Sequence, residues 1–163
     1  MSTVATPQIH LPETIEALQR MPDFVLAAIA AVGRDGTRFK LSPEDFCLIE
    51  HACHLRDLER EGYLVRVRRM LSEPRPALEP FDGAAVAAAR DYMQQDARMA
   101  GMEFAAARKE LLGLLAPLTD AELSRPGTFG DKPVTLGEVI AMMVAHDREH
   151  RVEIEALLDR VED

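Results

Sequence analysis

Apolar residues recur with helical spacing in four long segments of the chain. The first segment, residues 12–32, carries them three and four positions apart, at Ile15, Leu18, Phe24, Val25, Ala28 and Ile29. This spacing predicts an amphipathic helix. Pro22 should kink or restart that helix, because proline lacks the backbone N–H that a helix interior uses. Gly33 should end it, since glycine is favoured just past helix C-termini.

Local signals place the start and the end of the second helix. Ser42 is expected to cap it and Pro43 to occupy its first turn, the positions that these residues favour. The helix should continue to about Leu71. The next stretch, residues 72–80, contains three prolines and is predicted to be a stiff, non-helical connector.

The remaining helices are predicted from their caps. Asp82 should cap a third helical segment, which covers residues 84–115 with an interruption, and Thr119 should start a short turn. Residues 125–134, with two glycines and two prolines, are expected to form a surface loop.

The last helix begins at a capping box. In Thr135-Leu-Gly-Glu138, each side chain can satisfy a free backbone N–H of the first turn, and the helix should run to about Val161. Nothing in the sequence is typical of a strand. The expected fold is therefore an all-α four-helix bundle, in one domain covering residues 1–163 with its core between about 12 and 161.

Composition narrows the function classes. The formal net charge is −9, and apolar residues make up 47% of the chain. Nucleic-acid binding needs a concentrated basic face, whereas the one basic cluster, Arg66, Arg68 and Arg69, is interpreted as a solvated helix face. No apolar run is long enough to span a bilayer. We therefore expect neither a nucleic-acid nor a membrane partner.

Cysteine usage and the N-terminal residues indicate the compartment. Cys47 and Cys53 are isolated thiols without metal or disulfide spacing, and they are interpreted as core residues of a protein in a reducing environment. The first ten residues lack the features of a signal peptide. The expected localisation is cytoplasmic.

Two histidines in the last helix carry the main chemical signal. His146 and His150 are four residues apart, so they stack on one helix face, where two imidazoles can bind a single ion. Asp147 and Glu149 flank them but point off that face. They are interpreted as solvated residues rather than as a general base.

A third ligand has to come from another helix. His54, near the middle of the second helix, is the best candidate, and three imidazoles would leave one coordination position open for water or substrate. His51, one turn earlier, is an alternative: it could be the ligand itself or a group that orients one.

A family resemblance covers most of the chain. The segment FCLIEHACHLRDLER, residues 46–60, resembles the second-helix signature of the DinB/YfiT-like superfamily, in which a glutamate precedes the metal histidine by four residues and an acidic residue and a Glu-Arg pair follow it. The resemblance continues through residues 80–82 and 104–108 and ends at His146 and His150. It assigns the ligand position to His54. Phe46-Cys47 replaces the usual Trp-Ser pair, and no loss of metal binding is expected from this.

The resemblance implies a divalent metal ion, zinc or nickel, on His54, His146 and His150, in a homodimer. Relatives of this kind include thiol S-transferases, so a low-molecular-weight thiol is a further expected cofactor and a small-molecule electrophile the expected substrate. A close variant is a hydrolase in which the ion activates water. The other hypothesis is a non-enzymatic metal-binding or stress-linked interaction domain. One fold hosts many chemistries, so the resemblance alone does not choose among these.

Overall fold

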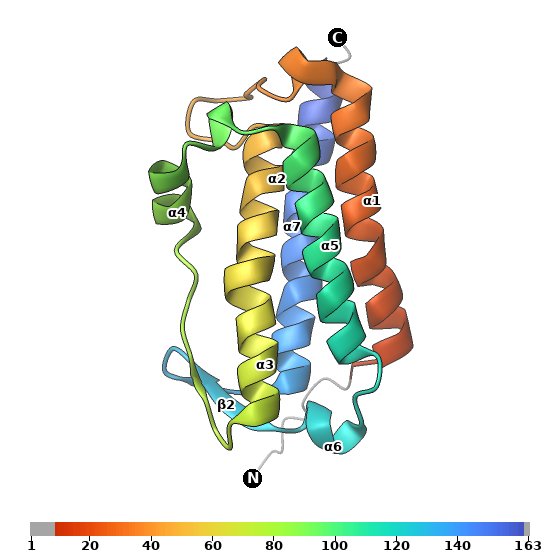
Figure 1. Cartoon of the computed structure of the whole chain (residues 1–163), viewed down its shortest axis with the longest axis vertical. Coiled ribbons are helices and arrows are strands. Elements are labelled where there is room, and N and C mark those ends of the chain that lie inside the picture. Colours follow the sequence, from red (N-terminus) through yellow and green to blue (C-terminus); the bar gives the residue numbers. More distant parts are fainter. Residues whose placement is uncertain (1–8, 162–163) are drawn as a thin grey trace.

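The computed structural model describes residues 9–161, which fold as four long helices packed side by side (Figure 1). The second of the four is continuous through a short π-helical segment, η1. The bundle consists of α1 (Leu11–Gly36), α2–η1–α3 (Leu48–Asp57, Leu58–Tyr63 and Leu64–Ser72), α5 (Ala97–Leu115) and α7 (Leu136–Val161). The predicted four-helix bundle is confirmed.

A small sheet closes one end of the bundle (Figure 1). Its three strands are β1 (Ala77–Leu78), β2 (Pro126–Phe129) and β3 (Lys132–Thr135), in the order β1-β2-β3. The prediction of no strand, with a plain loop over residues 125–134, was therefore wrong. β2 and β3 form an antiparallel hairpin whose turn contains Gly130 at φ 58°, and β1 from the proline-rich connector pairs with β2 in parallel.

The connection between α3 and α5 runs outside the four long helices, along α2 (Figure 1). It contains α4 (Gly83–Arg90) and the 3-10 turn η2 (Tyr92–Gln94), so the expected interruption of the third helical segment is confirmed. The Asp82 carboxylate accepts a hydrogen bond from the Ala85 N–H at 3.1 Å, which confirms that cap.

Two further caps occur where the sequence predicts them. Thr119 and Glu122 form a capping box at α6 (Asp120–Leu123). At α7, the Thr135 N–H donates to the Glu138 carboxylate at 2.7 Å, and the Glu138 N–H donates to the Thr135 hydroxyl at 3.1 Å. This capping box fixes the start of the helix that carries two of the predicted ligands.

The second helix begins five residues later than predicted. Its N-cap is Cys47, and the Glu50 carboxylate accepts from the Cys47 backbone N–H at 3.1 Å. The Ile49 N–H donates to the Thr37 carbonyl, a tertiary contact that a helix already formed at Pro43 would not leave available. Burial raises the pKa of the Cys47 thiol to about 11, in keeping with a core residue.

The first helix runs through Pro22, and Gly33 is its single residue with non-helical angles, at φ 67° and ψ −178°. Because Pro22 has no N–H, the carbonyl of Leu18 loses its partner within the helix. The guanidinium of Arg108, on α5, donates to that carbonyl at 2.9 Å. A buried arginine thus satisfies the group that the proline leaves free, which explains why the helix needs no restart.

The apolar core consists of two clusters stacked along the bundle. On each long helix the change from one to the other falls at the same level: Leu18 and Met21 belong to different clusters, as do Phe104 and Ala107. On α7 the two clusters are separated by residues 144–153, and most of the buried polar side chains lie at this level. The bundle therefore holds a polar layer between two apolar layers.

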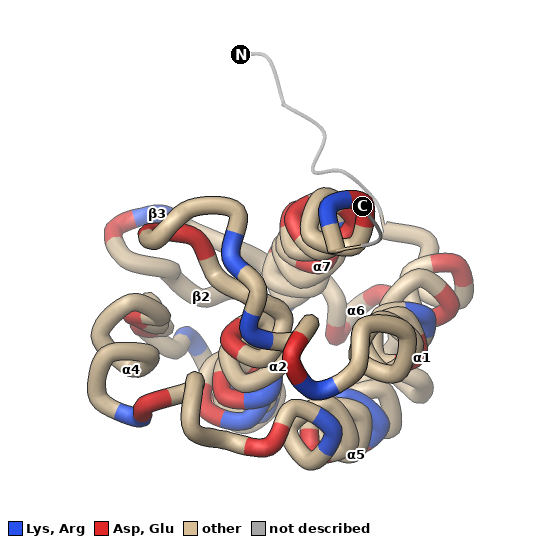
Figure 2. The backbone as a smooth tube through the Cα atoms, turned by 90° about the horizontal axis from the view of Figure 1, so that it is seen from above, with Lys and Arg blue, Asp and Glu red and all other residues tan. Residues whose placement is uncertain are grey.

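Charged residues of both signs are distributed over the same helices. Viewed along the bundle, Lys and Arg lie beside Asp and Glu on α1, α2 and α5 (Figure 2). Within residues 9–161, no helix is both long and apolar enough to cross a membrane.

Candidate metal centre

The polar layer contains the two histidines predicted on α7. His146 and His150 lie one helical turn apart, with their ring centroids 4.3 Å apart and their Nε2 atoms 3.0 Å apart. His150 is buried and His146 is partly buried. The i, i+4 spacing therefore brings the two imidazoles together on an inward face, as predicted.

His54 reaches the same place from α2. Its ring centroid lies 4.9 Å from that of His150 and 5.6 Å from that of His146. Each of the three side chains has a ring nitrogen within 4.8 Å of the other two. The three predicted ligands therefore lie close together, although His54 is on α2 and His146 and His150 are on α7.

Burial keeps the three imidazoles neutral. Desolvation is the largest cause that lowers the pKa of His54 and of His146 to about 4, and of His150 to about 2. For His150, the neighbouring His146, His51 and His54 lower the pKa further. At pH 7 each ring therefore has an unprotonated nitrogen with a lone pair, the form that binds a metal ion.

The donor set fits one divalent ion. In a tetrahedral site with bonds to nitrogen of about 2.0–2.1 Å, ligand atoms lie roughly 3.3 Å apart. The Nε2 atoms of His146 and His150 are 3.0 Å apart, and the ligand atoms of all three histidines lie within 4.8 Å of one another. Three imidazoles suit zinc, nickel or copper rather than magnesium or calcium. His54 Nδ1 is one of only two buried side-chain nitrogen or oxygen atoms in the described chain without a hydrogen-bond partner. The site is therefore chemically suited to an ion.

His51 lies behind His150 rather than in this group. Its Nδ1 is 2.9 Å from Nδ1 of His150, the ring nitrogen opposite to the one that faces His146. If His150 binds an ion through Nε2, its Nδ1 carries the proton and donates to His51. His51 Nε2 then faces the Glu153 carboxylate at 3.6 Å. His51, His150 and the exposed Glu153 also have possible ligand atoms within 4.8 Å of one another. For an ion on His54, His146 and His150, the geometry favours His51 as the group that orients a ligand.

Replacing His51 tests this role. In His51→Ala we expect one metal equivalent to be retained but with an affinity about 10–100-fold lower, the usual cost of losing a hydrogen-bond partner of a ligand. Competition with a chromophoric chelator measures the affinity. Glu149→Ala, an exposed change on the same helix as His150, is the control and should leave the affinity unchanged. Complete loss of metal in His51→Ala would instead make His51 a ligand.

Aromatic side chains and one glycine enclose the histidines. The ring of Phe46 lies 5.5 Å from that of His54, and the ring of Tyr63 lies 6.2 Å from that of His146. Gly83, at the start of α4, packs against His54 so closely that a Cβ atom there would lie 2.7 Å from Cε1 of the imidazole. These groups fix the His54 ring and lower the local dielectric around the site.

Asp147 is not solvated, contrary to the prediction. It is 8% exposed, and its carboxylate accepts two hydrogen bonds from Arg108, at 2.7 and 3.0 Å. Arg108 also donates to both oxygens of Glu59, at 3.0 and 2.9 Å. Arg108 on α5 therefore joins Asp147 on α7 to Glu59 on η1, and this network connects three elements of the bundle. Glu149 is exposed, as predicted.

The π-helical segment places Glu59 in this network. The Leu64 N–H donates to the Glu59 carbonyl five residues back, so the turn is wider by one residue than an α-turn. Glu59 and Tyr63 face inward, while Arg60 and Glu61 are exposed. Sequence reasoning missed Glu59 and Arg108. The available signal was that Arg108 continues the buried stripe Ala100–Phe104 at four-residue spacing.

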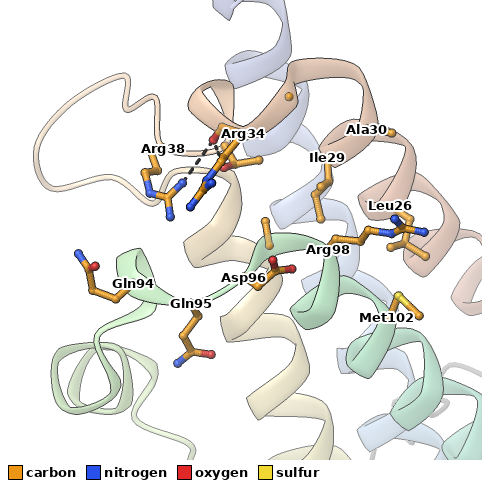
Figure 3. Close-up of a pocket in the computed structure, with 13 residues that line it drawn as sticks. Leu26, Ile29, Ala30, Arg34, Arg38, Gln94, Gln95, Asp96, Arg98 and Met102 are labelled. Carbon is orange, nitrogen blue, oxygen red and sulfur yellow. Dashed lines mark hydrogen bonds between the residues drawn. The ribbon is translucent and has the colours of Figure 1, made fainter.

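A groove of about 910 Å³ lies elsewhere, between the end of α1 and the start of α5 (Figure 3). Leu26, Ile29 and Met102 contribute apolar walls, and Arg34 and Arg38 lie on one side of it. None of the three histidines lines this groove. The groove is therefore separate from the candidate metal centre.

Comparisons with known proteins agree with this fold. No curated protein matches the sequence. Among solved structures, the chain is similar to YfiT from Bacillus subtilis, described as a probable metal-dependent hydrolase with an unusual four-helix bundle topology. The TM-score is 0.86 at 21% identity, over 99% of this chain and 93% of that one. The sequence also matches the family model of the DinB superfamily over residues 13–154. The chain therefore belongs to the DinB superfamily.

Proposed function

We propose that this chain is a metal-dependent hydrolase of a small-molecule substrate, with one divalent ion held by His54, His146 and His150. The observation that carries the proposal is the convergence of three neutral, mostly buried imidazoles, which no fourth ligand joins among residues 9–161. Such a set is typical of catalytic sites, whereas structural sites are closed by four protein ligands. The description of YfiT as a probable hydrolase supports the same reaction class.

The ion would supply a bound water of lowered pKa, or polarise a substrate carbonyl. The protein contributes orientation and the exclusion of water. With Nε2 of His150 on the ion, His51 would accept a hydrogen bond from Nδ1 of His150 and fix its ring, and the aromatic side chains around the histidines make the site poorly solvated. Glu59 and Asp147 both accept hydrogen bonds from Arg108, so this cation holds their carboxylates in the polar layer.

The reaction class can be tested with generic probes. Protein loaded with zinc or nickel is incubated with p-nitrophenyl acetate, and separately with 1-chloro-2,4-dinitrobenzene with or without cysteine as the thiol. We expect ester hydrolysis that needs metal but no thiol, and that is lost in chelator-treated protein and in His146→Ala.

Loss of the chlorobenzene only when cysteine and metal are both present would replace the hydrolase with a thiol S-transferase, in which the ion holds the thiol as thiolate. Both cysteines of the chain are fully buried, and burial raises the pKa of each to about 11. The nucleophilic thiol would therefore have to be a separate molecule. Inactivity of the metal-loaded protein in both assays would favour a non-enzymatic role.

A further inference from the structure

Arg66 is the second residue with an unpartnered buried nitrogen. It lies on α3 and is 6% exposed, so the expectation of a solvated basic face was wrong at this position, whereas Arg68 in the same cluster is exposed. The Nε of Arg66 is buried without a hydrogen-bond acceptor, and among the described residues Arg66 forms no ion pair. A charge buried without a partner is costly, and it calls for an explanation.

The surroundings of Arg66 hold the guanidinium without neutralising it. Its Cζ lies 5.1 Å from the ring centroid of Tyr63 and 4.8 Å from that of Phe129. One Nη atom donates to the backbone carbonyl of Glu79 at 3.3 Å. These contacts orient the planar group but use only part of its five donors. Burial lowers the pKa of Arg66, and the charge and hydrogen bond of the neighbouring Tyr63 offset part of this effect.

Arg66 lies beside the candidate metal centre. Tyr63 contacts both, since its ring lies 6.2 Å from that of His146. Arg66 and the candidate metal centre are therefore linked through the ring of Tyr63.

The charges of this region favour an anion. Three neutral imidazoles leave a bound divalent ion at +2, and Arg66 adds one more positive charge. The buried carboxylates of the polar layer already have cationic partners: Glu59 and Asp147 pair with Arg108, and Asp57 pairs with Arg56. Glu153 is more than half exposed and faces His51 and His150 rather than Arg66. A ligand with a negative group would balance the excess charge.

We propose that Arg66 binds an oxyanion of the substrate, so that the substrate class is small molecules bearing a carboxylate or phosphate group. A guanidinium fork matches the paired oxygens of either group. The reacting part of the substrate would lie at the open metal position and its anionic group at Arg66. This assignment rests on the proposed metal site, but it concerns binding and not turnover.

The test is calorimetric titration of zinc-loaded protein with acetate and, separately, with inorganic phosphate. We expect Arg66→Met, which keeps an apolar chain of similar length against Tyr63 and Phe129, to bind the oxyanion at least about tenfold more weakly than wild type. Arg68→Met is the matched control, because Arg68 is exposed and pairs with Glu110 on the surface. It should bind like wild type.

Arg66→Lys keeps the charge but loses the fork, so its affinity should lie between the two. If circular dichroism shows that Arg66→Met is unfolded, the oxyanion affinity of Arg66→Lys is compared with that of wild type instead. Unchanged oxyanion affinity in the folded Arg66 variants would overturn the proposal, since the anion would then bind the metal alone or another place. Zinc content is measured in every sample. A wild-type protein that binds no zinc contradicts the metal site itself. Zinc-loaded Arg66 variants that bind the oxyanion as tightly as wild type contradict this inference only.

Discussion

Arg108→Met is expected to lower the free energy of unfolding by about 3–5 kcal/mol, the typical cost of removing one partner of a buried ion pair. Arg108 is 1% exposed and donates to both Glu59 and Asp147, so its loss leaves two carboxylates in the bundle without their cation. It also removes the donor to the Leu18 carbonyl, which Pro22 leaves free. Urea unfolding followed by circular dichroism measures the change.

Two further variants separate this explanation from simple loss of packing. Arg68→Met removes an exposed arginine and should cost less than about 1 kcal/mol. Adding Glu59→Gln and Asp147→Asn to Arg108→Met removes the stranded charges, and should recover part of the stability that the single change loses. A cost below about 1 kcal/mol for Arg108→Met, or no recovery in the triple variant, would contradict the account of this network.

His54→Ala and His150→Ala should each weaken zinc binding by roughly a hundredfold or more, since losing a ligand costs more than losing a partner that orients one. The two residues come from different helices, α2 and α7, so a similar loss in both would show that the ion bridges them. Affinity is measured by chelator competition, as for His51→Ala.

Stability has to be followed in the same variants. Both side chains are largely buried, so the thermal midpoint of the metal-free proteins is compared with that of metal-free wild type. His10→Ala is the matched control, because this histidine is exposed and lies outside the bundle. Zinc affinity that survives in either folded ligand variant would exclude that residue from the site.

Much of the bundle could be predicted because its signals are local. Apolar spacing identifies the long helices, and the side chains of Asp82, Thr119 and Thr135 act on backbone groups within three residues of themselves. The convergence of His146 and His150 follows from one helical turn. In each of these features both interacting groups lie within four residues of each other, so the sequence alone is sufficient to predict them.

The errors arise where partners come from other elements. Ser42 and Pro43 are good helix-starting residues, yet Glu50 caps Cys47 instead, and the Ile49 N–H binds Thr37 on a different element. The short strands β1 and β2 are individually too brief to show alternation, and they form because a hairpin and a connector meet. Local propensity is outweighed in both cases by tertiary contacts.

Burial of charged residues was the least predictable property. Asp147 has polar neighbours in sequence, and Arg66 belongs to a cluster with Arg68 and Arg69. Only the packing of α5 against α7, or of α3 against the hairpin, shows that Asp147 and Arg66 are enclosed. The π-turn adds to the difficulty, because the wider turn between Glu59 and Leu64 shifts the inward face by one residue. An ideal helical wheel therefore misplaces the residues that follow Glu59.

The metal content of the wild-type protein tests the central claim most directly. The chain is purified without an affinity tag or chelators, incubated with zinc or nickel, and analysed by elemental mass spectrometry and by X-ray absorption at the metal edge. The account predicts about one equivalent per chain, with several imidazole nitrogens at roughly 2.0–2.1 Å and a remaining light-atom ligand. No bound metal after loading, or an ion coordinated by sulfur, would contradict it.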